Sequence, residues 1–265
     1  MKVSIRDSRF RPGGSASSKS EQKHIQWVDH MTKNVIITDR DLLCNSLYST
    51  SCVYHAWLLE PYCIDPDPYE YILNDSHMYH SVFGHDIDRL GHLDNFIYIP
   101  TCMVHIDKKH WVISDKTKSV SACFSGKSQT IGHKLRHKIY ENIKEGIDFY
   151  GSITGKYLAD KSESIVEYKY HIVVENSNVE GYYTEKLIDC ILTGSIPIYW
   201  GSRHTPFHEG GMLRFCTVYD LMRIIRTLPD HKLDEKFIKL NYEIALSHTC
   251  PEKFIRDELS MIHLQ

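Results

Sequence analysis

The sequence predicts an α/β protein in which helices cover parallel sheets. In its second half, apolar runs at 120–124, 171–174 and 196–200 are separated by two amphipathic segments. The first of these, 135–143, carries an apolar residue at every fourth position, which is the spacing of one helix face. Strands that alternate with helices in this way usually lie parallel in one sheet, so the pattern predicts the fold class.

The first half contains shorter apolar runs between polar loops. Strands are expected at 3–5, 35–38, 53–59 and 96–100. The segments between these runs have only weak helical periodicity, so they predict no element with clear bounds. The polar stretch 114–119 separates the two halves, and we therefore expect two domains, residues 1–114 and 115–265.

The second half also contains helix boundaries. Thr184 is a residue type that caps helix N-termini, and apolar residues at helical spacing follow it. Gly194 is expected to close this helix before the strand at 196–200. From Leu221 onward the apolar spacing predicts further helices.

Charge and hydropathy exclude several classes of partner. The chain has 31 basic and 34 acidic side chains, a net charge of −3, and no basic stripe of the kind that nucleic-acid partners require. No apolar stretch has the roughly 18 residues of a transmembrane helix. Charges interrupt residues 1–7, so no signal peptide is expected. These features predict a soluble, cytoplasmic protein that binds neither nucleic acid nor the bilayer core.

Polar side chains gather where one predicted strand ends and the next helix begins. Glu175 and Asn176 end the strand, and Tyr182, Glu185 and Lys186 surround the helix start. A helix N-terminus suits a phosphate or a sugar hydroxyl, because its N–H groups are free and its dipole is positive. A lysine there is unfavourable and indicates pairing with a negative group. The alternative is a capped helix with exposed charges.

Two further residues are candidates for the same site. Arg136 lies on the preceding helix, and its planar guanidinium matches phosphate oxygens. The alternative is a solvated arginine. Glu60 ends an apolar run just before Pro61, where a partly desolvated carboxylate is a candidate general base. The alternative is a simple loop carboxylate.

Two other patterns point elsewhere. The segment 125–128 looks like the end of a phosphate-binding P-loop, but Ser121 stands where that motif needs glycine. A P-loop-like NTPase is therefore a second hypothesis. One stretch is rich in histidine but fits no metal motif, and no metal site is predicted there: His77, His80, His85 and His92.

Residues 168–202 resemble the signature of the family 10 glycosyltransferases, the α1,3/4-fucosyltransferases, and the bacterial members most. The shared pattern is an apolar strand, Glu-Asn, a short loop, Tyr-x-Thr-Glu-Lys, an amphipathic helix and Ile-Pro-Ile-Tyr-Trp-Gly-Ser. Weaker similarity extends to the helix at 135–140 and to the segment 59–61. The loop 125–130 departs from the Ser-Asn-x-Asn pattern of many members.

The resemblance implies a GT-B fold, with two Rossmann-like domains and the active site in the cleft between them. The second domain would bind GDP-fucose as donor. Arg136 and Lys186 would neutralise the diphosphate, Tyr182 would contact the nucleotide part and Asn176 would line the pocket. Glu185 would hold the fucose and stabilise positive charge that develops on its ring.

The resemblance also implies an inverting transfer in which Glu60 is the catalytic base. The acceptor would be an oligosaccharide that contains N-acetylglucosamine or galactose, and the scheme requires no metal or other cofactor. Asp65-Pro66-Asp67 is formally an Asp-x-Asp motif but is interpreted as a turn. Transfer from another GDP-sugar and a catalytically inactive glycan-binding module are the further alternatives.

Overall fold

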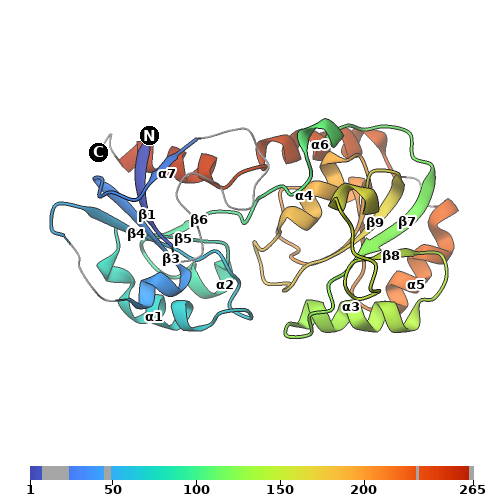
Figure 1. Cartoon of the computed structure of the whole chain (residues 1–265), viewed down its shortest axis with the longest axis horizontal. Coiled ribbons are helices and arrows are strands. Elements are labelled where there is room, and N and C mark those ends of the chain that lie inside the picture. Colours follow the sequence, from blue (N-terminus) through green and yellow to red (C-terminus); the bar gives the residue numbers. More distant parts are fainter. Residues whose placement is uncertain (8–23, 45–48, 231–232, 263–265) are drawn as a thin grey trace.

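The computed structural model describes residues 1–7, 24–44, 49–230 and 233–262. It contains two parallel sheets that lie side by side in two lobes (Figure 1). The six-stranded sheet has the order β2-β1-β3-β4-β5-β6, and the five-stranded sheet has the order β11-β10-β9-β7-β8. All pairings between named strands are parallel, as the sequence predicts.

The first lobe is built on the six-stranded sheet. Its strands are β1 (Lys2–Arg6), β2 (Gln26–Val28), β3 (Asn34–Thr38), β4 (Val53–Trp57), β5 (Ser81–Gly84) and β6 (Phe96–Tyr98). Its helices are α1 (Asp67–Asp75) and α2 (Ile87–Leu90), with short 3-10 helices η1 (Asp39–Leu43) and η2 (Ser76–Met78). The four strands expected from the sequence are present, and β2 and β5 are additional.

The second lobe is built on the five-stranded sheet. Its strands are β7 (Lys118–Cys123), β8 (Asp148–Tyr150), β9 (Tyr168–Val174), β10 (Ile196–Trp200) and β11 (Leu213–Arg214). Its helices are α3 (Ile131–Asn142), α4 (Glu185–Leu192), α5 (Val218–Thr227) and α6 (Glu235–Ser247). Short 3-10 helices complete it: η4 (Lys161–Ser164), η5 (Glu209–Gly211) and η6 (Leu228–Asp230).

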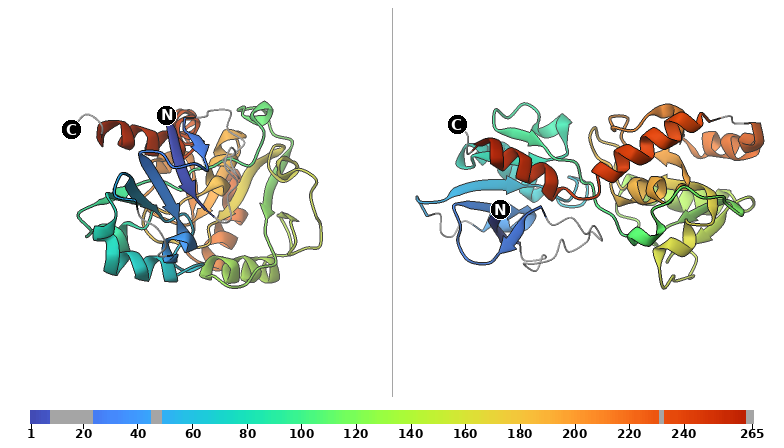
Figure 2. Two further views of the ribbon diagram at one scale, coloured as in Figure 1. Left: turned by 60° about the vertical axis from the view of Figure 1, so that its left-hand side comes forward. Right: turned by 90° about the horizontal axis from the view of Figure 1, so that it is seen from above.

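The segment 99–117, which contains the 3-10 helix η3 (Lys108–His110), joins the lobes. At its C-terminal end the chain passes from the second lobe back to the first. Helix α7 (Glu252–Ile262) lies over the first sheet, whereas α6 lies over the second (Figures 1 and 2). Ile255 and Leu259 of α7 are fully buried against Val3 and Trp57 of the first lobe. The domain division at residue 114 stays a prediction, but α7 packs with the first sheet.

The helix boundaries expected around α4 are confirmed. Thr184 caps the helix, because its side chain accepts a hydrogen bond from the amide of Lys186. Gly194 follows the helix with a φ of +72°, in the left-handed region that favours glycine. Among the described helices, none has the length and apolar character needed to cross a bilayer.

Candidate active site

The loop between β9 and α4 connects the second lobe to the first. The Tyr98 hydroxyl donates a hydrogen bond of 3.0 Å to the carbonyl of Gly181, and the ring centroids of His85 and Tyr182 are 4.8 Å apart. Gly181 has a φ of +83°, and a Cβ atom there would lie 2.4 Å from the carbonyl oxygen of His85. Only glycine fits this close approach. The two lobes therefore meet at the loop that carries Tyr182.

Glu175 fixes the start of α4 to the end of β9. Its Oε1 accepts a 2.9 Å hydrogen bond from the amide of Thr184, and its Oε2 accepts a 2.7 Å bond from the Thr184 hydroxyl. The carboxylate is fully buried. A buried carboxylate needs such partners, because desolvation alone is costly. Glu175 is therefore an anchor of the site.

Lys186 pairs with acidic groups, as its position at a helix N-terminus indicated. Its Nζ lies 3.2 Å from Glu185 Oε1 and 3.5 Å from Glu175 Oε2, and it donates a 2.9 Å hydrogen bond to the Thr184 hydroxyl. The side chain is partly exposed. The lysine thus offers a positive charge at the start of α4 while two carboxylates hold it in place.

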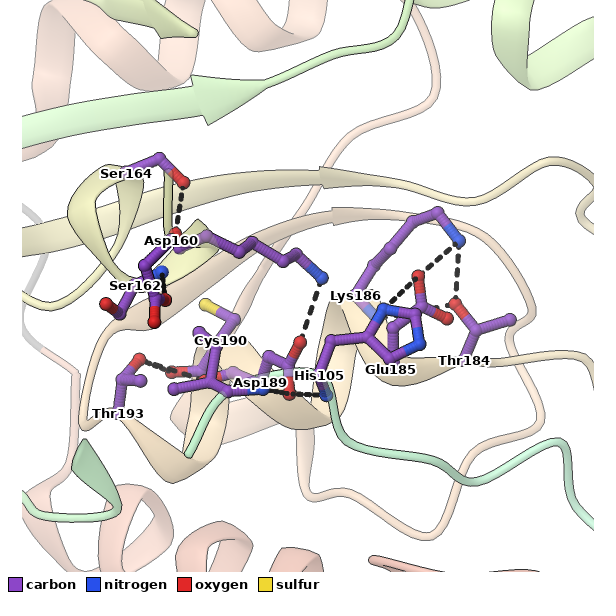
Figure 3. A network of polar contacts seen from close by, with 12 residues as sticks. His105, Asp160, Ser162, Ser164, Thr184, Glu185, Lys186, Asp189, Cys190 and Thr193 are labelled. Carbon is purple, nitrogen blue, oxygen red and sulfur yellow. Dashed lines mark hydrogen bonds and ion pairs between the residues drawn. The ribbon is translucent and has the colours of Figure 1, made fainter. Parts of the chain in front are cut away.

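Glu185 lies within a cluster of cations (Figure 3). Burial by itself would raise the pKa of Glu185, but the positive charges of Lys186 and Lys161 hold it well below its ordinary value. The carboxylate is therefore ionised at neutral pH. An anion at this position suits stabilisation of positive charge rather than proton donation.

Arg136 is not a solvated helix arginine, since it is only 4% exposed. Its Nε and Nη2 donate to the carbonyl of Val174, and Nη2 also donates a 3.0 Å hydrogen bond to Asn176 Oδ1. Burial lowers the pKa of Arg136, although Glu175 acts in the opposite direction, and a guanidinium stays charged in any case. Nη1 makes no hydrogen bond to the described residues, so part of the charged group is available at the end of β9.

Helix α3 approaches the same strand end closely. The amide of Gly132 donates a 3.2 Å hydrogen bond to the carbonyl of Asn176. A Cβ atom on Gly132 would lie 1.7 Å from the carbonyl oxygen of Glu175, so no larger residue fits. The N-termini of α3 and α4 consequently converge on the segment 175–177, and their positive dipole ends favour an anion there.

Glu60 approaches this region from the first lobe. It follows β4, its carbonyl accepts a 3.0 Å hydrogen bond from the Tyr69 hydroxyl, and its carboxylate accepts none from the described residues. Burial raises the pKa of Tyr182 well above its ordinary value, and Glu60 is among the nearby carboxylates that reinforce this. Glu60 therefore lies on the side of the first lobe that faces the loop carrying Tyr182.

Asp39 is a residue of this region that sequence reasoning missed. Its Oδ1 accepts hydrogen bonds from the amides of Leu59 (2.9 Å) and Glu60 (3.3 Å). Burial raises the pKa of Asp39 to about 7, although the two amide bonds oppose the shift. Its signal in the sequence is an acidic residue directly after the strand 35–38, a position equivalent to that of Glu60 after its own strand.

The remaining sequence motifs have structural positions. Both carboxylates of Asp65-Pro66-Asp67 contact Arg40, at 2.8 Å for Asp65 and 3.5 Å for Asp67, and Asp67 begins α1. Within the described ranges, no group of three or more His, Cys, Asp or Glu side chains could hold a metal. Lys127, in the P-loop-like segment, is exposed.

Comparisons with known proteins identify the second lobe. Residues 113–210 match the sequence model described as "Glycosyltransferase family 10 (fucosyltransferase) C-term". Over 73 residues, the chain is 37% identical to alpha-(1,3)-fucosyltransferase FucT of Helicobacter pylori, a match that covers 26% of this chain and 15% of that protein. It is 29% identical over 112 residues to the human 4-galactosyl-N-acetylglucosaminide 3-alpha-L-fucosyltransferase 9, covering 41% of this chain and 31% of the relative.

The solved structures extend the comparison to both lobes. A crystal structure of an α1,3-fucosyltransferase with GDP-fucose superposes with a TM-score of 0.54 at 17% identity, covering 92% of this chain and 80% of that chain. The corresponding structure with GDP gives the same score and coverage. At this identity the likeness shows the fold, which is GT-B as the sequence resemblance implied.

The chain matches the curated relatives over less than a third of their own lengths. The match over 113–210 includes the segment 125–128, so this P-loop-like loop is part of the glycosyltransferase domain. The sequence of the second lobe thus matches the C-terminal model of glycosyltransferase family 10, the fucosyltransferases, and the two lobes together have the fold of the solved α1,3-fucosyltransferases.

Proposed function

We propose that the protein transfers fucose from GDP-fucose to a hydroxyl of an oligosaccharide that contains N-acetylglucosamine or galactose, forming an α1,3-type linkage with inversion. The observation that carries this proposal is the meeting of the two lobes at the loop before α4, where Tyr98 donates a hydrogen bond to Gly181 and His85 packs against Tyr182. The names of the relatives support fucose transfer, since both specify 3-fucosylation.

The donor diphosphate would lie at the N-termini of α3 and α4. Arg136 and Lys186 supply positive charge there, and Asn176 lines the same strand end. In the structure Lys186 already contacts two carboxylates, so the diphosphate would share this lysine with them. Tyr182 is 3% exposed, and the edge of the tyrosine ring would contact the nucleotide part of the donor.

The transfer would be a single displacement. Glu60 accepts the proton of the acceptor hydroxyl, whose oxygen attacks the anomeric carbon, and GDP leaves from the opposite face. Arg136, Lys186 and the helix N-termini stabilise the negative charge that develops on GDP. Glu185, held ionised by its cationic neighbours, stabilises the positive charge on the sugar ring. No step of this scheme uses a metal ion.

The alternatives from the sequence differ in their support. Transfer from another GDP-sugar uses the same site, and no contact described above distinguishes the donor sugar. A P-loop-like NTPase is disfavoured, because its segment lies within the matched glycosyltransferase region. An inactive glycan-binding module would need no general base, so Glu60 would have no catalytic role in it. The cytoplasmic location stays a prediction.

The test is release of GDP from GDP-fucose, with GDP-mannose and UDP-galactose as control donors, in the presence and absence of N-acetyllactosamine. Acceptor-dependent release from GDP-fucose alone is expected. Release from GDP-mannose in preference to GDP-fucose would establish a different GDP-sugar transferase. Failure to bind GDP at all would contradict the proposed donor site.

A further inference from the structure

Helix α4 presents two carboxylates, one turn apart, to a single residue of the segment that joins the lobes (Figure 3). Asp189 Oδ1 accepts a 2.9 Å hydrogen bond from the backbone amide of His105 and a 3.3 Å bond from that of Ile106. Glu185 Oε1 lies 3.8 Å from Nδ1 of the His105 ring. Residues four apart lie on one helix face, so α4 holds both the backbone and the side chain of His105.

The backbone contact is built on a buried ion pair. The second oxygen of Asp189, Oδ2, accepts a 2.8 Å hydrogen bond from Lys161 Nζ. Asp189 is fully buried, and the side chain of Lys161 is 26% exposed. A buried carboxylate with all its contacts satisfied has little freedom to move. Lys161 therefore holds Asp189 in place, and Asp189 fixes the backbone of His105 relative to α4.

The two oxygens of Glu185 have different surroundings. Oε1 faces Lys186 Nζ at 3.2 Å and His105 Nδ1 at 3.8 Å. Oε2 accepts no hydrogen bond from the described residues, and the side chain is 16% exposed. The side chain of His105 is 39% exposed beside it. One oxygen is thus held by the protein while the other is available to a ligand hydroxyl.

We propose that His105 is a positioning residue of the donor site, which orients Glu185 so that its Oε2 receives a hydroxyl of the sugar of a nucleoside diphosphate sugar. This inference rests on the proposed function of the same site. The 3.8 Å separation is longer than a hydrogen bond, and such contacts commonly tighten when a substrate binds. After such tightening, the Nδ1–H group of a neutral imidazole would donate to Oε1 and keep the carboxylate from rotating.

The charge state of His105 fits this role. Burial lowers the pKa of His105, and so do Lys161 and Lys186, whereas Glu185 and Asp189 raise it. The net shift is downward, so the ring is neutral at pH 7 and above. Below its pKa the ring becomes a cation next to Glu185, which weakens the stabilisation of positive charge on the sugar.

The test compares the affinities of GDP and GDP-fucose, since their ratio isolates the contribution of the sugar. His105→Leu removes the N–H donor, and His105→Asn keeps a donor at the Nδ position without titrating. An exposed histidine in the first lobe provides the matched control, His92→Asn. Calorimetry at pH 7.5 on the full chain measures both dissociation constants for each variant.

His105→Leu is expected to weaken GDP-fucose binding about tenfold, the size of one hydrogen bond to a charged group, with GDP affinity unchanged, so the ratio of GDP affinity to GDP-fucose affinity should rise about tenfold. His105→Asn and His92→Asn should keep the ratio. A folded His105→Leu protein with the wild-type ratio would overturn the proposal. If the wild-type protein binds neither GDP nor GDP-fucose, the proposed function itself is wrong. This outcome is distinct from failure of the proposal for His105.

A pH profile covers the case in which His105→Leu does not fold. The turnover number of wild type should fall as the pH is lowered and the His105 ring becomes protonated. The His105→Asn variant should lack this decline, because asparagine does not titrate. Identical acidic limbs in the two proteins would show that His105 does not act on Glu185.

Discussion

Asp39 Oδ1 accepts a 3.3 Å hydrogen bond from the backbone amide of Glu60, the residue proposed as catalytic base. Asp39 has a φ of +37°, and no other non-glycine residue in the described ranges has a positive φ. Such a conformation is costly for a side-chain-bearing residue and persists where surrounding structure enforces it. The conformation of Asp39, directly after β3, therefore fixes the backbone position of Glu60, which follows β4.

Replacing Asp39 by asparagine should change how stability depends on pH. Burial raises the pKa of Asp39 from 3.8 to about 7. An acid whose pKa is raised by folding contributes stability that is full below pH 4 and is lost as the pH rises through 7. From pH 5 to pH 8, wild type should therefore lose up to about 3 kcal/mol relative to Asp39→Asn. Urea unfolding at both pH values measures this, and parallel pH slopes would contradict it.

Glu60→Gln should abolish transfer without weakening donor binding. Loss of a general base lowers turnover by roughly 10²- to 10⁴-fold. GDP affinity should be unchanged, because the proposed diphosphate contacts belong to the second lobe. Steady-state GDP release and calorimetry measure the two quantities. Glu70→Gln, an exposed carboxylate on α1, is the control, and near-normal turnover in Glu60→Gln would disprove the assignment.

Arg136→Ala should weaken both the fold and GDP binding. The substitution removes the donors to the carbonyl of Val174 and to Asn176 Oδ1, and a buried acceptor without a partner costs about 1–3 kcal/mol. Thermal unfolding and calorimetry measure the two effects. The exposed Arg223 on α5 provides the matched arginine control. If GDP affinity is unchanged in folded Arg136→Ala, this arginine does not face the donor.

Asp189→Asn should destabilise the protein by leaving Lys161 without its buried anion. Removing one partner of a buried ion pair costs about 3–5 kcal/mol. Burial alone would lower the pKa of Lys161, but Asp189 and Glu185 raise it above its ordinary value, so the ion pair holds the lysine charged. Asp189→Asn combined with Lys161→Met should cost less than the sum of the single changes. Strictly additive changes in unfolding free energy would show that the pair is not coupled.

Much of the fold was predictable because parallel strands are buried on both faces. All residues of β3 are buried, and β10 is buried except for its last residue, so each is centred on a run of apolar residues in the sequence. The strand β5, with the sequence SVFG, was missed because it is short and ends in glycine. Helix α1 was missed since it contains Pro68 and several polar residues in its nine positions.

The candidate site was predictable in its residue types but not in its contacts. Strand ends and a helix cap point to Glu175, Lys186 and Glu60 without any knowledge of tertiary structure. The hydrogen bonds from Arg136 to Val174 and from His105 to Asp189 join residues 38 and 84 positions apart, and no local spacing encodes them. His85, from the histidine-rich stretch, packs against Tyr182.

The central claim is that Glu60 and the second lobe together transfer fucose to a glycan hydroxyl. The most direct measurement is the structure of the product that wild type and Glu60→Gln form from GDP-fucose and N-acetyllactosamine, determined by mass spectrometry and NMR. The account predicts a single fucosylated product from wild type, with the anomeric configuration inverted relative to the donor, and almost none from Glu60→Gln. A product with retained configuration, or equal yields from the two proteins, would contradict it.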